Sequence, residues 1–195
     1  MDKKKIQRDR MMNYFIEATK KIIEEEGIKK VTVRRVGDLA GYSYATIYNY
    51  FKDTRELLAH CAIHYLEYFY ACIKEVNVEN LEIKEQILKY SEEYFMFFSK
   101  HPEIFNLIFI EDLGHFPELI SETVKKPSLR DLLTEQLKIC AEKAYIKPEN
   151  IEYIHSLIIT SIHGKLLLHI NKRRGGEVED YIRDIKKEIL FLLGE

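Results

Sequence analysis

The sequence predicts an all-α fold, and both its composition and its periodicity favour this class. Only eight Gly and four Pro occur in 195 residues, which is few for a turn-rich β architecture. Apolar residues recur every three or four positions along most of the chain, and no convincing strand pattern interrupts them. These observations indicate about nine helices.

Local signals set the ends of the first four predicted helices. Gly27 supplies a left-handed residue that ends the first of them. Thr32 is placed to cap the second helix, and Ser43 to cap the third across a turn at Gly41. The run Asp53–Glu56 has the form of a capping box that opens the fourth. The expected ranges are 8–26, 33–40, 44–51 and 54–75.

Similar signals divide the rest of the chain. Pro102 begins a sixth helix at a position where its missing N–H costs nothing. Ser128 with Asp131 forms a second start of the capping-box kind, and Pro148 opens the eighth helix. Gly175 and Gly176 separate the eighth helix from the ninth. The expected helices cover 83–100, a segment from 102, 129–144, a segment from 148, and 178–192.

Charge is distributed unevenly along the chain. Residues 1–60 carry 13 Lys and Arg against 9 Asp and Glu, whereas the remainder carries 17 against 23. A basic segment on an acidic body fits a small part that meets phosphate and a larger part that does not. We therefore expect two domains, 1–53 and 54–195.

Several classes of protein are disfavoured. No window approaches 18 consecutive apolar residues, and the basic N-terminus leads into a charged amphipathic stretch, so a cytoplasmic location is expected. Cys61, Cys72 and Cys140 are isolated, and their spacing indicates neither a disulfide framework nor a thiolate zinc site.

The seven histidines form no catalytic motif, so no enzyme and no cofactor is expected. His60 and His64 share a helix face with Cys61 between them. This spacing leaves a metal-responsive regulator open as an alternative, although no metal site is predicted.

The short helices over 33–40 and 44–51 resemble a helix-turn-helix behind a longer first helix. Such a unit places the start of its second short helix in the major groove of DNA. Ile47 and Phe51 would pack inward, whereas Ala45 and Asn49 would face the base edges. Hydroxyl groups of neighbouring tyrosines would reach phosphate oxygens.

At this point the sequence resembles the TetR/AcrR family of bacterial regulators. The run Val31–Leu58 carries the resemblance, with Thr32, Ala40, Gly41, Ser43, Tyr48, Tyr50, Phe51 and Leu57 in register with the family pattern. Three positions depart from it. Gly37 stands where the family usually has Ala, which weakens the helix by up to about 1 kcal/mol but permits closer packing. Tyr44 and Ala45 replace a frequent Lys or Arg and a frequent Gly.

The resemblance implies a regulator, with repression as the commoner mode, that binds a palindromic site on double-stranded DNA. It implies that Ser43, Tyr48, Tyr50 and Lys52 hold phosphates, while Tyr44, Ala45 and Asn49 contact bases. The full expected DNA-binding set is Thr32, Arg34, Ser43, Tyr44, Ala45, Thr46, Tyr48, Asn49, Tyr50 and Lys52.

The C-terminal body is expected to form a homodimer and to bind an effector. The eighth helix is apolar almost all round, and the family pairs its last two helices across the dimer, here about 149–172 and 177–193. Aromatic residues crowd the body and suggest a small, largely apolar effector. The expected ligand-binding set is Tyr65, Tyr68, Phe69, Tyr94, Phe98, Phe105, Phe109, Leu133, Leu137 and Ile162.

Two functions of different classes compete with an effector-controlled regulator. A binding module could keep this fold without contacting DNA, but the unbroken run Ser43–Lys52 argues against it. A DNA-architectural protein without effector control would have no cavity in its body.

Overall fold

The computed structural model describes residues 3–116, 119 and 129–195, and every regular element among them is a helix. This confirms the predicted fold class. The chain divides into two compact units that are each discontinuous in sequence. The first unit comprises Met1–Glu67 with Glu103–Val124, and the second comprises Tyr68–Pro102 with Lys125–Glu195. Helix α4 (Thr54–Lys74) runs from one unit into the other.

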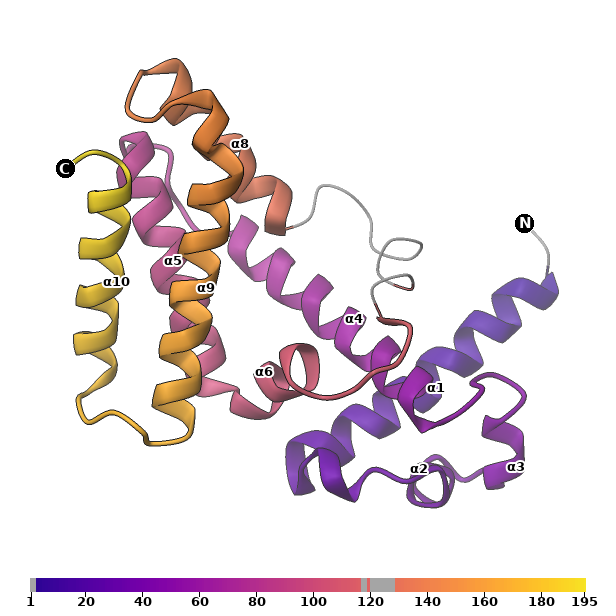
Figure 1. Cartoon of the computed structure of the whole chain (residues 1–195). Helices are drawn as coiled ribbons and strands as arrows, with labels where there is room; N and C mark the ends of the chain where they lie inside the picture. The colour runs from indigo at the N-terminus through magenta and orange to yellow at the C-terminus, as the bar shows by residue number, and fades with distance from the viewer. Residues whose placement is uncertain (1–2, 117–118, 120–128) are drawn as a thin grey trace. The chain divides into compact units, whose positions relative to one another are not determined.

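The first unit contains three N-terminal helices and their short connections. Helix α1 (Lys3–Glu26) begins five residues before the predicted start and ends as predicted. After a 3-10 turn over Ile28–Lys30, α2 (Val33–Ala40) and α3 (Tyr44–Ile47) follow (Figure 1). Helices α1 and α2 pack together, as do α2 and α3. Their shared core includes Phe15, Ile16, Val36, Ile47, Phe51 and Leu57, each at most 2% exposed.

The expected helix over 44–51 is wrong in its C-terminal half. The α-helix ends at Ile47, and the chain then tightens into a turn in which Asn49 N–H bonds to Thr46 O and Tyr50 N–H to Ile47 O. These two bonds span three residues instead of four, which gives a turn of smaller radius, and Phe51 N–H closes it with a four-residue bond to Ile47 O.

The second unit is built from α5 (Ile83–Lys100), α8 (Leu129–Glu142), α9 (Ile151–Ile170) and α10 (Val178–Leu192). Helices α5, α9 and α10 contact one another and lie side by side in Figure 1. Buried side chains between them include Phe95, Ile158, Leu166, Tyr181 and Ile185. Helix α6 (Pro102–Phe109) begins at the predicted proline, and all of it after Pro102 belongs to the first unit.

Two further helix ends depart from expectation. The predicted seventh helix extended to Ala144, but α8 ends at Glu142 because Ala144 adopts the left-handed φ of 59°. Pro148 opens a 3-10 turn, and α9 begins after it at Ile151. The capping role predicted for Ser128 lies outside the described residues. No helix in the described part of the chain is long and apolar enough to cross a membrane.

Candidate nucleic-acid interface

Side-chain caps hold the two short helices of the first unit. Thr32 Oγ1 accepts a hydrogen bond from the Arg35 amide at 3.2 Å, and Ser43 Oγ accepts one from the Thr46 amide at 3.3 Å. The Thr46 hydroxyl lies 2.9 Å from Ser43 Oγ. The bonds from the Arg35 and Thr46 amides each satisfy a backbone donor that the helix leaves free. The hydroxyl groups of Thr32, Ser43 and Thr46, all three predicted to bind DNA, therefore also take part in hydrogen bonds that hold the two short helices.

Gly37 and Gly41 make a close crossing of α2 and α3 possible. Gly41 ends α2 with a left-handed φ of 71°, which glycine adopts without steric cost. A Cβ placed on Gly37 would lie 2.7 Å from Tyr42 O and 3.3 Å from Tyr44 N. The closer packing that we expected from glycine at position 37 is thus present, and it brings α3 directly against the α2 backbone.

Residues 44–51, hereafter the recognition segment, present two different sides. Ile47 and Phe51 are 0% and 2% exposed, as predicted. Tyr44 and Tyr48 are 61% and 50% exposed, and Ala45 and Asn49 are exposed with them. The small and polar groups expected to meet base edges therefore lie on the solvent side. This surface suits entry into a groove, since no apolar core has to be uncovered first.

Tyr50 differs from the other tyrosines of the segment. Its side chain is half-buried, and its ring lies 5.6 Å from the ring of Phe15 on α1. The guanidinium of Arg8 lies over the same ring at 5.2 Å from its centroid. The ring is thus fixed between α1 side chains, whereas the phosphate contact expected of its hydroxyl stays a prediction.

Arg8 is a residue of this site that sequence reasoning missed. Its Nη1 donates a hydrogen bond to Asn49 O at 2.8 Å, and its Nη2 donates one to Tyr50 O at 3.3 Å. These carbonyls lie 41 and 42 residues along the chain. A basic run near the N-terminus was visible in the sequence, but no local pattern indicates which cation meets a distant carbonyl.

The remaining predicted contacts lie at the edges of the segment. Arg34 on α2 and Lys52 after the segment are both exposed. Asp53 Oδ1 accepts a hydrogen bond from the Glu56 amide at 2.9 Å, which confirms the predicted cap of α4. The Glu56 carboxylate in turn accepts from the Lys52 amide. Two hydrogen bonds therefore hold the short connection between the recognition segment and α4.

Comparisons with known proteins agree with this geometry. Residues 15–61 match the model of the bacterial regulatory proteins of the tetR family, and this range contains the recognition segment. By this match, residues 15–61 are a segment of the tetR-family type. The description of that model, bacterial regulatory proteins, names a class of regulators. No curated protein matches the chain in sequence.

Solved structures of regulators share the fold over nearly the whole chain. FadR of Thermus thermophilus in complex with lauroyl-CoA has a TM-score of 0.70 and 15% identity, covering 93% of this chain and 94% of its own. FadR of Bacillus subtilis with stearoyl-CoA has a TM-score of 0.68 and 20% identity, covering 93% and 98%. BioQ with its double-stranded DNA operator has a TM-score of 0.64 and 19% identity, covering 94% and 97%.

The residues expected to bind an effector fall in both units. Phe69, Tyr94 and Phe98 form one cluster in the second unit, with ring centroids 4.8 to 5.3 Å apart. Leu137 and Ile162 are buried in the same unit, Leu133 is half-buried, and Tyr68 is 60% exposed. Tyr65, Phe105 and Phe109 belong to the first unit, where the Tyr65 hydroxyl donates to Glu24 Oε1 at 2.8 Å. Ligand contact by any of the ten stays a prediction.

A polar pair formed by the buried Tyr94 and the half-buried His163 adjoins this aromatic cluster. The Tyr94 hydroxyl lies 2.6 Å from His163 Nε2, and the two rings stack. Burial raises the pKa of Tyr94 and lowers the pKa of His163 to about 4. Both groups are therefore neutral near pH 7, and the pair adds hydrogen-bonding capacity to an apolar environment without adding charge.

The lowered pKa of His163 predicts acid sensitivity of the second unit. The unfolded chain takes up this proton near pH 6.5, whereas the folded chain takes it up only near pH 4, so stability falls as pH decreases through this window. We expect His163 to account for about 1–3 kcal/mol of this loss. His163→Gln is expected to flatten the dependence of unfolding free energy on pH, measured by urea titration between pH 7 and 4.5. His115→Gln, at an exposed position, should leave the dependence unchanged, and an equally steep profile for both variants would contradict the assignment.

The metal-responsive alternative receives no support from the described residues. No group of three or more His, Cys, Asp or Glu side chains converges there as a metal site. The His60 ring packs on Phe51 at 5.5 Å, and His64 Nδ1 lies 3.8 Å from a Glu17 carboxylate oxygen. Burial raises the pKa of the Cys61 thiol, which disfavours the thiolate that a metal requires.

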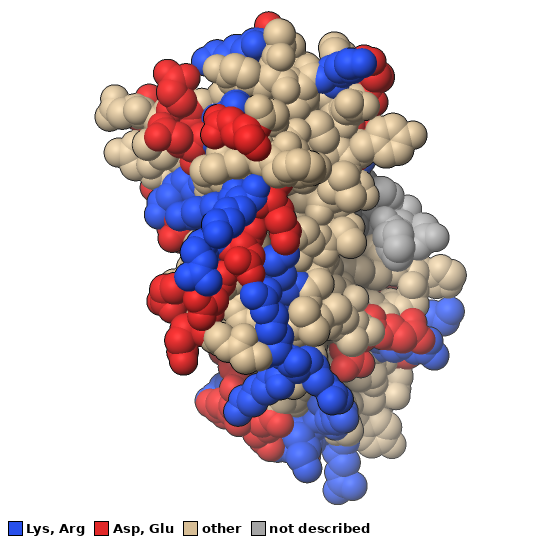
Figure 2. All heavy atoms as spheres, turned by 60° about the vertical axis from the view of Figure 1, so that its left-hand side comes forward, with Lys and Arg blue, Asp and Glu red and all other residues tan. Residues whose placement is uncertain are grey.

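Charges on the second unit are largely balanced in pairs. Figure 2 shows Lys and Arg interleaved with Asp and Glu over the face that it presents. Lys165 contacts Glu188 at 2.6 Å, Lys186 contacts Glu92 at 2.8 Å, and Lys84 contacts Glu195 at 2.7 Å. Such pairing leaves little unbalanced positive charge to attract a phosphate backbone. The DNA-binding assignment accordingly stays with the first unit.

Proposed function

We propose that this protein is a homodimeric repressor of the TetR family that binds a palindromic operator through its recognition segment and is released by a small, largely apolar effector. The carrying observation is the exposed side of that segment, formed by Tyr44, Ala45, Tyr48 and Asn49 above a buried Ile47. One such segment contacts too few base pairs for high affinity, so a symmetric pair is required.

We assign the proposed dimer surface to α9 and α10, the two helices expected for this role. Large apolar side chains are exposed on both helices, with Tyr153 at 73%, Leu157 at 53%, Leu168 at 40% and Phe191 at 76%. Gly164 has open space where a Cβ would stand, which suits close approach of another helix. An exposed apolar surface of this kind is typical of an interface with a protein partner.

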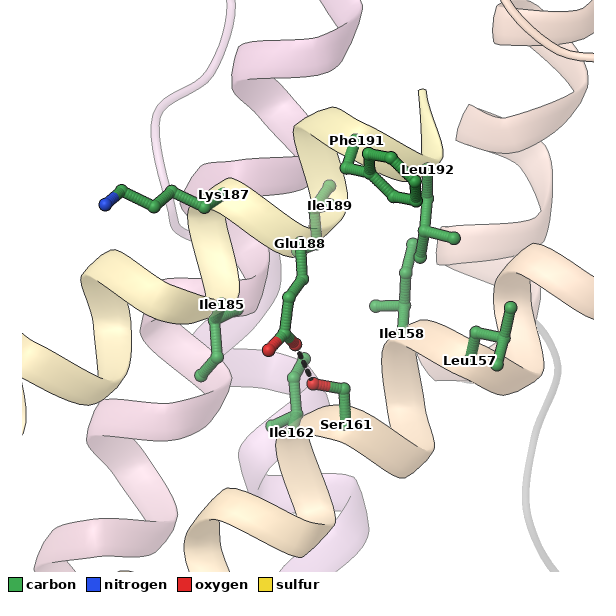
Figure 3. Close-up of a pocket in the computed structure, with 10 residues that line it drawn as sticks. All are labelled: Leu157, Ile158, Ser161, Ile162, Ile185, Lys187, Glu188, Ile189, Phe191 and Leu192. Atoms are coloured by element: carbon green, nitrogen blue, oxygen red, sulfur yellow. Dashed lines mark hydrogen bonds between the residues drawn. The ribbon is translucent and has the colours of Figure 1, made fainter. Parts of the chain in front are cut away.

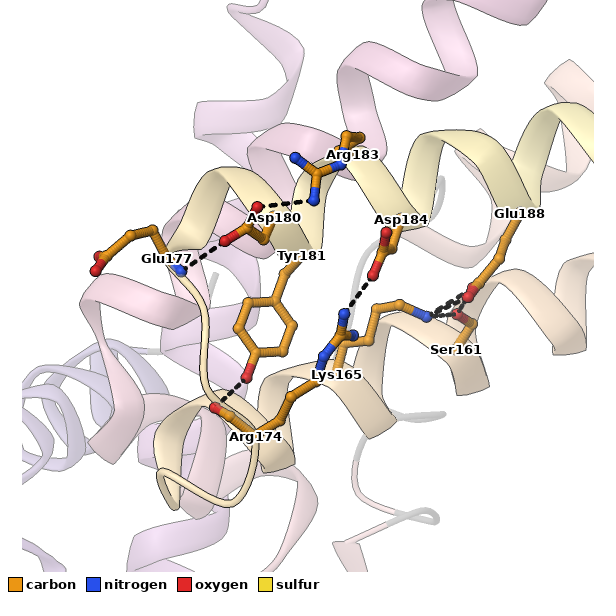
Figure 4. Close-up of polar contacts among 9 residues, drawn as sticks. All are labelled: Ser161, Lys165, Arg174, Glu177, Asp180, Tyr181, Arg183, Asp184 and Glu188. Atoms are coloured by element: carbon orange, nitrogen blue, oxygen red, sulfur yellow. Dashed lines mark hydrogen bonds and ion pairs between the residues drawn. The ribbon is translucent and has the colours of Figure 1, made fainter.

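A groove between α9 and α10 divides this surface. Its volume is about 340 Å³, and its lining is mostly aliphatic, with Leu157, Ile158, Phe191 and Leu192 on its rim and walls (Figure 3). Ser161 donates a hydrogen bond to Glu188 inside it. The Lys165–Glu188 pair and the Arg174–Asp184 pair at 2.6 Å join the α9 side to α10 (Figure 4). Ion pairs and a hydrogen bond therefore hold α9 and α10 together, and we propose that a second copy of the chain docks on this pair of helices.

Effector control is proposed to act through α4. This helix carries its N-terminal part in the first unit and its C-terminal part in the second. An effector that prefers one spacing of the paired recognition segments by about 1–3 kcal/mol lowers operator affinity by about 5- to 150-fold. Two structurally similar regulators hold acyl-CoA, which makes lauroyl-CoA a reasoned first probe.

The function is tested by selecting bound duplexes from a random pool with the full-length protein. We expect an inverted repeat whose half-sites lie about one helical turn apart. Lauroyl-CoA is then titrated into the operator complex, with CoA alone as the control for its polar part. Recovery of no common sequence would contradict the regulator function, whereas a complex insensitive to every apolar probe would contradict effector release alone.

Asn49 is expected to contact a base directly. Asn49→Ala should cost about 1–3 kcal/mol at one base pair of each half-site, because paired hydrogen bonds from the amide to adenine are lost. Competition binding with operators substituted at single positions measures this effect. Glu25→Ala, at an exposed residue on α1, serves as the control. Equal loss of affinity at every operator position would assign Asn49 to the backbone and not to a base.

A further inference from the structure

The last backbone carbonyls of the recognition segment lack hydrogen-bond donors within their own helix. Only four residues, Tyr44–Ile47, are α-helical, and the turn after them is held by two bonds that span three residues and by one, from Phe51 N–H to Ile47 O, that spans four. A short helix leaves its last carbonyls without partners inside the helix. In a longer recognition helix the carbonyls of residues 49 and 50 would accept from amides farther on. Here either water or another part of the chain supplies these donors.

Arg8 of α1 supplies them. Its two Nη atoms donate to the neighbouring carbonyls of Asn49 and Tyr50 at 2.8 and 3.3 Å. The same guanidinium lies over the Tyr50 ring, whose other neighbour is Phe15. One planar group thus holds two backbone oxygens and one aromatic ring. Lysine cannot reproduce this, because a single ammonium lacks the fork and the flat face.

We propose that Arg8 is a positioning residue for DNA recognition, which sets the direction of the Asn49 and Tyr48 side chains by fixing the backbone that carries them. This inference rests on the proposed function of the segment. Arg8 then contributes to sequence discrimination without itself contacting a base. The proposal differs from a simple basic arm, because a basic arm adds affinity for every duplex equally.

The test compares Arg8→Lys and Arg8→Ala with the unaltered protein on the selected operator and on a scrambled duplex over a range of salt concentrations. We expect Arg8→Lys to lose roughly tenfold in the ratio of operator to scrambled affinity, comparable to one mismatched base pair. Its slope of log affinity against log salt should stay unchanged, since the charge is retained. Arg10→Ala, which removes a charge from the same exposed helix end, is the matched control and should retain the ratio.

Three results would overturn the proposal. If Arg8→Lys retains full discrimination while Arg8→Ala weakens both duplexes equally and reduces the salt slope by about 0.9, Arg8 is a phosphate contact. If Arg8→Lys and Arg8→Ala both have a lower melting temperature but keep the ratio of operator to scrambled affinity at low temperature, Arg8 contributes to stability alone. If the unaltered protein selects no sequence at all, the proposed function fails, and this result is distinct from the first two.

Discussion

Replacing Leu157 and Phe191 together by aspartate is expected to convert the protein to monomers and to lower operator affinity by about 100-fold or more. Both side chains are more than half exposed in the single chain, at 53% and 76%. They lie on neighbouring helices around one groove, so a second copy would bury both. A carboxylate buried without a partner costs several kcal/mol, which exceeds what the surrounding apolar contacts contribute.

Operator affinity falls because the two recognition segments are no longer joined in one dimer. When two recognition segments are held in one dimer, binding of the first half-site brings the second segment close to its own half-site. This raises operator affinity by about 100- to 10,000-fold over that of a single segment. Sedimentation equilibrium measures the mass of each variant, and titration of the operator and of an isolated half-site measures the linkage. Ile139→Asp, at an apolar residue that is 40% exposed on α8, is the matched control and should stay dimeric. A dimeric double variant would place the interface elsewhere.

Gly37→Ala is expected to destabilise the first unit by about 1–3 kcal/mol, the usual cost of overpacking. The added methyl group would meet Tyr42 O at 2.7 Å and Tyr44 N at 3.3 Å. Both atoms belong to the backbone, so no side chain can rotate away. The chain between α2 and α3 must shift, and the recognition segment shifts with it. Operator affinity is therefore expected to fall even where the protein remains folded.

Urea unfolding of the full chain and operator titration well below the melting temperature measure the two effects separately. Gly175→Ala is the control, because no atom lies within 4 Å of its added methyl group and its φ is not in the left-handed region. Higher helix propensity of alanine favours the substitution at position 37 by about 1 kcal/mol. A Gly37→Ala variant that is more stable and binds DNA normally would show that the contact between α2 and the start of α3 can accommodate a methyl group.

Sequence reasoning located most helix ends because they depend on neighbouring residues. Thr32 and Ser43 cap α2 and α3 as predicted, since a cap bonds to an amide only three residues away. The buried positions of Ile47 and Phe51 also follow from local periodicity. The end of α3 was misplaced, because helical spacing does not distinguish four-residue from three-residue hydrogen bonds.

The sequence by itself determined the all-α class, the helix-turn-helix and the exposed side of the recognition segment, because each depends on interactions within a few residues. Only the tertiary structure decided that Gly37 is a contact point of two backbones and that Arg8 holds carbonyls 41 and 42 residues away. It also decided that Phe69, Tyr94 and Phe98 form one cluster while Tyr65 bonds to Glu24 in the other unit. Such pairings depend on how whole helices pack, and packing is a property of distant segments that no local pattern records.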